Sequence, residues 1–305
     1  MKIKNRDISH TLKSSGLVLN IGFFKFNICS SLRTIEETIS TLYCDYERTE
    51  YDNIDELIDF HVQVKQVKHF SSLPFFNRQA QFFLDNTAPF TPLPIQHAPA
   101  IIEWGMNWCI SSQLNTHLVI HAAVIEKNGF AAVMPAPPGS GKSTLTASLI
   151  QEGWRLLSDE LTLIHLDNHR VSPFPRPVSL KNESINVIKN RYPDVVFGPV
   201  SSDTAKGTVC HIRPPTLSVK NQHIDCPVGW VIFPKYQAGA ETEFLPFGKA
   251  QTLMSIAENS FNYSVLGQLG FDALKNIVAT ADCYQFKYSN LDEAVNIFSE
   301  LEPPK

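Results

Sequence analysis

The sequence predicts an α/β protein in which a small α+β N-terminal unit, residues 1–95, precedes a larger domain with mixed sheets, residues 96–305. Three observations lead to this prediction. Short apolar runs with strand-like or helical spacing fill the first 90 positions. Four prolines then fall within eleven residues, and a strand, a glycine-rich loop and a helix follow in order over residues 130–152. Strands that alternate with helices in this way indicate layers packed around a sheet.

The composition excludes several classes of protein. Of the 305 residues, 43% are hydrophobic and 18% charged, which is enough for a full core and unlike a disordered chain. Lys plus Arg total 26 against 30 Asp plus Glu, so no basic surplus favours binding to nucleic acid. No apolar run approaches the roughly 18–20 residues that cross a bilayer, and the polar start MKIKNRDISH does not resemble a secretory leader. We therefore expect a cytoplasmic protein without a membrane partner.

The predicted N-terminal unit contains strands around one helix. Apolar runs over residues 17–28 predict one or two strands, and residues 59–67 and 78–86 predict two more. Between them, Leu32, Ile35, Ile39 and Leu42 have helical spacing, with Ser30 and Ser31 as candidates for capping the first turn. The prolines at 89, 92, 94 and 99 exclude a helix or central strand and place the boundary there.

The predicted second domain begins with a helix over residues 100–114, whose tryptophans are more typical of packing than of base stacking. Residues 117–127 and 130–136 predict a hairpin, because Asn128-Gly129 is a favoured turn pair. Near the C-terminus, residues 229–236 predict a buried strand. The last predicted elements are a strand containing Tyr284, Phe286 and Tyr288 and a helix containing Leu291, Ala294, Val295 and Phe298.

The glycine-rich loop APPGSGKS, residues 136–143, matches the Walker A pattern except that Ala136 stands in place of its first glycine. In such a loop, backbone N–H groups and the positive end of the following helix hold phosphate oxygens. Pro137 and Pro138 have no N–H, so we expect the donors to come from the glycines and the residues after them. The expected nucleotide-binding residues are Gly139, Ser140, Gly141, Lys142, Ser143 and Thr144. Lys142 would contact the β- and γ-phosphates, and the Ser143 hydroxyl would bind Mg²⁺.

An acidic pair, Asp159-Glu160, follows only 17 residues after Lys142. A helix from Lys142 to residue 152 is about 16 Å long, and a returning strand from Trp154 to Asp159 spans about the same distance. The carboxylates should therefore lie level with the bound phosphates. On a strand Asp159 would share a face with apolar residues, which makes it a candidate general base, while Glu160 is a candidate for the metal. A solvated acidic turn in a hairpin is the alternative.

At these residues the sequence resembles a known family. His121, the next strand, GSGKST, the helix ending at Gly153 and RLLSDE are similar to the catalytic domain of HPr kinase/phosphorylase, a bacterial protein-serine kinase whose fold is similar to that of phosphoenolpyruvate carboxykinase. This resemblance spans roughly residues 115–170. The segments EWGMNW, PFPRPVSLKN and KGTVCHIRPP resemble a branch called HPr kinase-related kinase A, and with them the similarity covers most of residues 95–250.

The resemblance implies roles for individual residues. Asp159 matches the family's first acidic residue, which removes the proton from the acceptor serine, and His121 matches a histidine near the active site. Glu160 stands where the family usually has a second aspartate, and its longer side chain would reach the metal with a shifted geometry. A lone histidine in an apolar strand is more often a core residue. Residues 1–90 do not match the family's N-terminal domain, so the resemblance does not imply HPr as the acceptor.

Phosphoryl transfer also needs positive charge around the migrating group. Arg176 lies between two prolines, which hold it in an extended segment, while Lys206 and Arg213 lie at the ends of predicted elements. From the sequence alone, each of these three residues fits a solvated surface cation as well as it fits a catalytic residue. The resemblance to the kinase A branch favours a catalytic role for all three.

Together these observations predict an ATP- and Mg²⁺-dependent phosphotransferase that acts on a serine-like hydroxyl of a protein or peptide. Assembly into a homo-oligomer is compatible with the prediction. A kinase for small molecules is an alternative, because relatives of the fold act on small carboxylates. A nucleotide-dependent switch without transferase activity is another, and it should hydrolyse ATP slowly without an acceptor.

Overall fold

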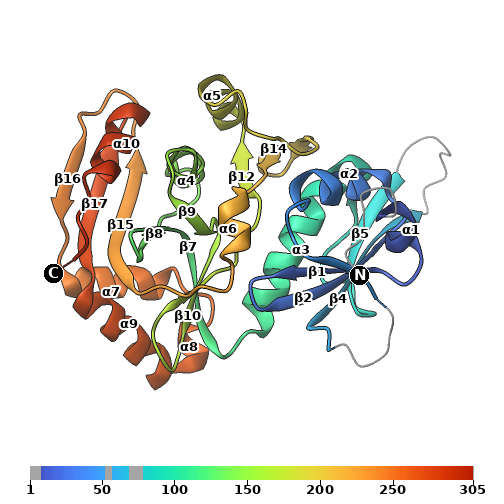
Figure 1. Ribbon diagram of the computed structural model, residues 1–305, viewed down its shortest axis with the longest axis horizontal. Helices are drawn as coiled ribbons and strands as arrows, with labels where there is room; N and C mark the ends of the chain where they lie inside the picture. Colours follow the sequence, from blue (N-terminus) through green and yellow to red (C-terminus); the bar gives the residue numbers. More distant parts are fainter. Residues whose placement is uncertain (1–7, 52–56, 69–77, 305) are drawn as a thin grey trace. The chain divides into compact units, whose positions relative to one another are not determined.

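The computed structural model describes residues 8–51, 57–68 and 78–304, which divide into two compact units (Figure 1). The first unit extends to Ile110 and also contains residues 179–189 and 194–213. The second unit contains residues 111–178, 190–193 and 214–305. The sequence predicts a single boundary after residue 95. The compact units instead divide the chain after Ile110 and return two later segments to the N-terminal unit.

The main sheet of the first unit has six strands in the order β3-β1-β2-β4-β5-β6. Strand β2 pairs with β4 in parallel, whereas its pairing with β1 is antiparallel, so the sheet is mixed. The predicted strands and helix of this region are confirmed, with two strands over residues 17–28. The elements are α1 (Ile8–Lys13), β1 (Leu17–Ile21), β2 (Phe24–Ser30), α2 (Arg33–Leu42), β3 (Arg48–Glu50), β4 (Phe60–Lys68), β5 (Arg78–Leu84), β6 (Leu93–Pro94), the 3₁₀ turn η2 (Ile95–His97) and α3 (Ala98–Gln113).

The start of α2 differs from the prediction that a serine caps it. Leu32 is the N-cap residue, and no side chain accepts a hydrogen bond from the first turn there. Ser30 Oγ instead accepts from Leu32 N at 3.1 Å and donates to Val64 O at 2.7 Å. The hydroxyl therefore connects the end of β2 to β4, and the two bonds explain why it is not used as a helix cap.

Helix α3 packs on this first sheet, which explains why the compact unit extends past the proline cluster. A Cβ added at Gly105 would lie 2.1 Å from the Phe82 ring, so the helix approaches β5 closely. The Trp108 ring packs edge-on against Phe90 at 5.7 Å between centroids, which confirms that it serves packing. The unit also holds most of a three-stranded sheet and of a helix, since only Val178 and the last two residues of α5 fall in the second unit. These elements are β12 (Val178–Lys181), α5 (Glu183–Arg191), β13 (Ser201–Thr204) and β14 (Gly207–Ile212), with the strands ordered β12-β14-β13.

The second unit contains an eight-stranded mixed sheet in the order β11-β10-β7-β8-β15-β17-β16, with β9 also paired to β7. The predicted hairpin is confirmed, because β7 and β8 pair antiparallel and the turn residues Asn128 and Gly129 have φ of 55° and 85°. Strands β8, β15 and β17 are parallel neighbours. The elements are β7 (His117–Lys127), β8 (Phe130–Pro135), α4 (Lys142–Gln151), β9 (Arg155–Ser158), β10 (Leu161–His165), β11 (Val171–Ser172), α6 (Thr216–Lys220), β15 (Val228–Tyr236), β16 (Glu243–Pro246), α7 (Lys249–Glu258), α8 (Tyr263–Leu266), α9 (Gln268–Thr280), β17 (Asp282–Tyr288) and α10 (Leu291–Ser299).

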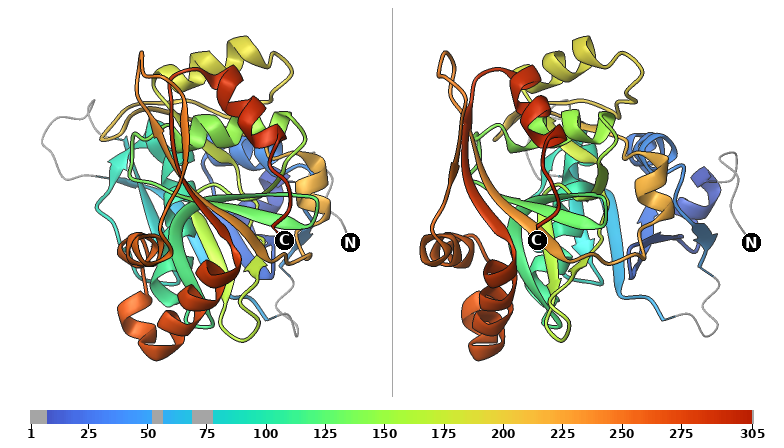
Figure 2. Two further views of the ribbon diagram at one scale, coloured as in Figure 1. Left: turned by 90° about the vertical axis from the view of Figure 1, so that its left-hand side faces the viewer. Right: turned by 60° about the vertical axis from the view of Figure 1, so that its left-hand side comes forward.

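Helices cover both faces of this second sheet. Val231 and Cys283 belong to an apolar core with residues of α7 and α9. The adjacent Trp230 faces the other way and contacts the Trp154 ring, which in turn contacts Phe298 of α10. Figure 2 shows α4 and α10 on the opposite side of the sheet from α7 and α9. The two helical layers leave the carboxyl ends of β8, β15 and β17 at one edge, where ligands usually bind in α/β sheets.

The longest helix in the described part of the chain, α3, has 16 residues. Within residues 8–51, 57–68 and 78–304, no helix combines the length and the apolar character that a bilayer span requires.

Candidate functional site

The glycine-rich loop connects the carboxyl end of β8, at Pro135, to the first residue of α4, Lys142. Gly139 and Gly141 have φ of 86° and 84°, a left-handed conformation that costs glycine little and other residues more. Ala136 is buried and keeps an ordinary negative φ, so this loop does not require a glycine at that position. The strand, loop and helix predicted from the sequence are therefore present in the predicted order.

On one side, the loop is held by the ends of β15 and β17. Tyr236 N donates to Ser140 O at 2.8 Å, and Tyr288 Oη donates to Gly141 O at 3.2 Å. A Cβ at Gly141 would lie 2.6 Å from Tyr288 Oη and 2.7 Å from Tyr236 Cβ. Burial, and to a lesser degree the neighbouring Tyr236, raises the pKa of Tyr288, so its hydroxyl remains a donor at neutral pH. These contacts fix the second half of the loop.

On the other side of β8 lies the acidic pair, at the junction between β9 and β10. Both strands pair antiparallel with β7, with Ser158 opposite Val124 and Leu161 opposite His121. The chain therefore continues in one direction along β7, and no hairpin turn occurs at Asp159-Glu160. The prediction of a regular strand through Asp159 is also inexact, because the ladder is interrupted at these two residues. Asp159 is 3% exposed, which is incompatible with a solvated turn.

The loop and the acidic pair meet at the first turn of α4. Ser143 Oγ donates a hydrogen bond to Asp159 Oδ2 at 3.1 Å. Lys142, the preceding residue, is only 8% exposed. The structure thus brings Ser143 to Asp159, whereas the sequence analysis had assigned Ser143 to the metal together with Glu160, which is partly buried. Lys142 and Ser143 occupy adjacent positions at the amino end of α4, and the carboxylate that meets the Ser143 hydroxyl comes from the junction between β9 and β10.

Two other candidates from the sequence lie in the same unit. His121 is opposite Leu161 in the β7–β10 ladder, and its ring lies 5.9 Å from that of Phe261. Its backbone N–H donates to Asn259 O at 2.7 Å. Arg176 is 5% exposed and its guanidinium lies 5.5 Å from the centre of the Phe174 ring. Arg176 is therefore not the solvated surface cation that the sequence left as an alternative.

Lys206 and Arg213 belong to the first compact unit. The Lys206 ammonium lies 5.2 Å from the centre of the Trp104 ring, and the residue is exposed. Arg213 Nη1 donates to Cys44 Sγ at 3.1 Å. A catalytic role for these two residues stays a prediction.

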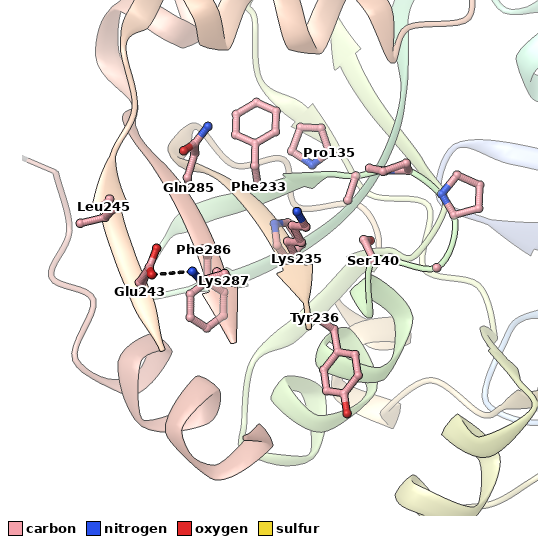
Figure 3. Close-up of a pocket in the computed structure, with 15 residues that line it drawn as sticks. Pro135, Ser140, Phe233, Lys235, Tyr236, Glu243, Leu245, Gln285, Phe286 and Lys287 are labelled. Atoms are coloured by element: carbon pink, nitrogen blue, oxygen red, sulfur yellow. Dashed lines mark hydrogen bonds and ion pairs between the residues drawn. The ribbon is translucent and has the colours of Figure 1, made fainter. Parts of the chain in front are cut away.

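A cavity of about 570 Å³, not predicted from the sequence, lies at the carboxyl edge of the second sheet. Residues 135–140 of the loop form one wall, and β15, β16 and β17 form the floor (Figure 3). Its side chains form two rows across the three strands, because paired residues share a face of the sheet. The first row is Phe233, Gln285 and Leu245, and the second is Lys235, Lys287 and Glu243.

A signal for this cavity was present in the sequence. Lys235, Gln285 and Lys287 are polar residues near the carboxyl ends of two strands that are apolar in their central part. A buried parallel strand that becomes polar on one face at its carboxyl end is leaving the core and approaching the ligand-binding edge. The strands were predicted from the apolar positions alone, and the polar ones were not used.

Comparisons with known proteins identify no family for this chain. No protein-family model matches it, and no curated protein matches it. Among solved structures, the Hpr(Ser) kinase/phosphatase from Coxiella burnetii aligns with a TM-score of 0.27 and 12% sequence identity, over 59% of this chain and 91% of that chain. A TM-score this low does not establish a common fold.

Proposed function

We propose that this protein is an ATP- and Mg²⁺-dependent kinase that transfers phosphate to a serine-like hydroxyl of a protein or peptide. The observation that supports this proposal best is the 3.1 Å hydrogen bond from Ser143 Oγ to Asp159 Oδ2. It joins a loop of Walker A sequence to a buried carboxylate 16 residues beyond Ser143 along the chain. A phosphate held by the loop would therefore lie beside a group that can accept a proton.

The loop would bind the phosphates through the N–H groups of Gly139 to Ser143, at the positive end of α4. Lys142 would neutralise charge on the β- and γ-phosphates. Asp159 would accept the proton of the attacking hydroxyl, because it is a buried carboxylate that already contacts the first turn of α4 through Ser143. Arg176 and His121 would contribute to positioning and charge around the migrating group.

The donor set fits Mg²⁺ brought with the nucleotide. Within the described residues no cluster of three or more His, Cys, Asp or Glu side chains could hold a metal alone. Mg²⁺ typically binds one or two carboxylates together with substrate phosphates, so a hydroxyl and an acidic pair suffice. Ser143 would hold the ion with Glu160 or Asp159, and the bound ion would offset negative charge on the phosphates.

Radiolabelled ATP with its label in the γ-phosphate tests the proposal. The protein and Mg²⁺ would be incubated with this ATP, with and without a protein extract of the source organism. Lys142→Ala serves as the inactive control, since it removes a charge that the loop chemistry requires. We expect label on a macromolecule, only when extract and wild-type protein are both present.

The alternatives give different results in the same experiment. Label transferred to acid-soluble small compounds would indicate a kinase for small molecules. Slow release of labelled inorganic phosphate, at the same rate with and without extract, would indicate a nucleotide-dependent switch without transferase activity. Neither result is compatible with a protein kinase.

A further inference from the structure

We infer that the cavity between the loop and β15–β17–β16 binds the nucleoside of the donor nucleotide, so that donor and acceptor approach the loop from opposite sides. The inference rests on the proposed function and adds to it the location of the nucleoside. It depends on three observations in the second unit: the side of β8 on which each group lies, the two rows of side chains in the cavity, and the attachment of the loop to the cavity floor.

The order of the strands separates two sides of the loop. Strands β7, β9 and β10 lie on one side of β8, and β15, β17 and β16 lie on the other. Asp159 is on the first side and contacts the start of α4 through Ser143. The cavity is on the second side, where Tyr236 N holds Ser140 O at 2.8 Å.

Phosphoryl transfer constrains how a nucleotide can lie across this loop. The attacking and leaving oxygens are roughly in line with the transferred phosphorus. If Asp159 takes the proton of the attacking hydroxyl, the acceptor lies on the β9 side of the phosphorus. The leaving diphosphate, and the nucleoside attached to it, must then extend away from Asp159. The cavity lies in that direction, and its volume of about 570 Å³ is within the usual range for small-molecule sites.

The first row of the cavity has the chemistry of a base site. Phe233 offers an aromatic surface at one end and Leu245 an aliphatic one at the other. Gln285 lies between them, because it pairs with Phe233 on β15 and with Leu245 on β16. Its amide has both donors and an acceptor, which suits the edge of a nucleobase. Figure 3 shows these three side chains in one line above the sheet.

The second row is charged and lies closer to the attachment of the loop. Lys235 pairs in register with Lys287, and Lys287 with Glu243, to which its ammonium is ion-paired. Lys235 directly precedes Tyr236, whose N–H binds the loop at Ser140. The row therefore places cations next to the phosphate loop and a carboxylate acceptor further from it. This order suits a molecule with phosphates at the loop and ribose hydroxyls beyond them.

The decisive experiment compares ATP with inorganic tripolyphosphate, which carries the same phosphate chain without a nucleoside. Affinities for both would be measured by titration calorimetry with Mg²⁺ present. Leu245→Trp would fill the first row, and its side chain is 53% exposed, so the core is not disturbed. Leu269→Trp, at a 58% exposed leucine of α9 outside the cavity, is the matched control. Gln285→Ala removes the amide.

We expect Leu245→Trp to weaken ATP binding by about tenfold or more and tripolyphosphate binding by less than about twofold. Gln285→Ala should also weaken ATP binding more than tripolyphosphate binding, but by a smaller factor than Leu245→Trp. Leu269→Trp should change neither affinity. Tripolyphosphate binding by each variant also shows that its loop is folded. If Leu245→Trp and Gln285→Ala both bind ATP as the wild type does, the nucleoside lies elsewhere.

Failure of this inference can be distinguished from failure of the proposed function. If the cavity variants keep ATP affinity while Lys142→Ala loses both ligands, the loop binds nucleotide and only the location of the nucleoside is wrong. If a cavity variant weakens ATP and tripolyphosphate equally, the cavity binds phosphate and the inference is also wrong. If the wild-type protein binds neither ligand, the proposed function fails and the inference with it.

Discussion

The two sides of the glycine-rich loop differ in burial and in chemistry. On the β9 side, Asp159 is 3% exposed and meets the loop through a side-chain hydrogen bond from Ser143. On the β15 side, the loop is held by a backbone N–H and a buried tyrosine hydroxyl, while the cavity rows beside it are mostly exposed. Under the proposed function, a proton and a phosphate would meet on the first side, beside a buried carboxylate. The second is an open surface that a ligand can cover.

Under the proposed function, this difference separates the residues that carry out the reaction from those that bind the nucleoside. A carboxylate that must change its protonation state responds strongly to burial, because desolvation and nearby charge shift its pKa. Side chains that only contact a ligand act by shape and hydrogen bonding, and they can remain exposed until the ligand arrives. Variants on the two sides of the loop should therefore affect different measured quantities.

The largest effect is expected from Lys142→Ala, which should remove detectable nucleotide binding and turnover. The residue is 8% exposed at the start of α4. Its ammonium would bind the β- and γ-phosphates, so its loss should affect both the reaction on the β9 side and nucleotide binding on the β15 side. Titration calorimetry with ATP and Mg²⁺ checks this outcome. Lys275→Ala, at an exposed lysine of α9, is the matched control. Wild-type affinity in Lys142→Ala would refute the phosphate-loop assignment.

Asp159→Asn should lower phosphoryl transfer by about 10²- to 10⁴-fold, the usual contribution of a positioned general base. Asparagine keeps an oxygen that can accept from Ser143 Oγ, but it cannot take up a proton. ATP affinity should change little, which is the opposite of the effect expected in the cavity. Single-turnover transfer measured beside ATP binding distinguishes the two.

Glu160→Gln tests whether the second carboxylate of the acidic pair has a different role from Asp159. If Glu160 binds the metal, this variant should raise the Mg²⁺ concentration required for half-maximal rate and leave the saturated rate nearly unchanged. A normal Mg²⁺ requirement would instead favour Asp159, which already contacts Ser143, as the metal-side carboxylate. Loss of folding stability in both variants, with normal transfer, would make the acidic pair structural.

The sequence predicted the β9 side of the loop well because its signals are local. The hairpin turn, the glycines and the distance from Lys142 to Asp159 all depend on residues within one stretch of chain, 117–165. The cavity could not be predicted from local sequence signals. Its rows join Phe233, Gln285 and Leu245 from three strands, and only the pairing register brings them together.

The extent of the N-terminal unit could not be predicted from local sequence signals either. Pro89 and Pro92 lie outside regular structure, but Pro94 belongs to the two-residue strand β6 and Pro99 to the first turn of α3. That helix packs on the first sheet through Gly105. Helical spacing shows that a helix has an apolar face, not which sheet that face will cover. The return of residues 179–189 and 194–213 to this unit is likewise a consequence of tertiary contacts.

Gly141→Ala should destabilise the protein more than Gly153→Ala, although both glycines have positive φ. Gly153 has φ of 89° and open space around its Cα, so Gly153→Ala should cost only about 1–2 kcal/mol of backbone strain. At Gly141 the new Cβ would also lie 2.7 Å from Tyr236 Cβ, which cannot move without the strand. Chemical denaturation should therefore show a loss about twice as large. Equal losses would mean that the loop is not held tightly from the β15 side.

The smallest effect is expected from Tyr288→Phe, which removes the hydrogen bond to Gly141 O at 3.2 Å and leaves the ring in place. The acceptor carbonyl loses a buried partner, so the free energy of unfolding should fall by about 0.5–1.5 kcal/mol. Tyr284→Phe, four residues earlier on β17, is the matched control, because its ring stacks on Phe244 away from the loop. If the hydroxyl positions the loop, Tyr288→Phe should also weaken tripolyphosphate binding by a fewfold, whereas Tyr284→Phe should not. A stability loss with unchanged tripolyphosphate affinity would show that the tyrosine supports the sheet edge and that the backbone bond from Tyr236 alone is enough to hold the loop.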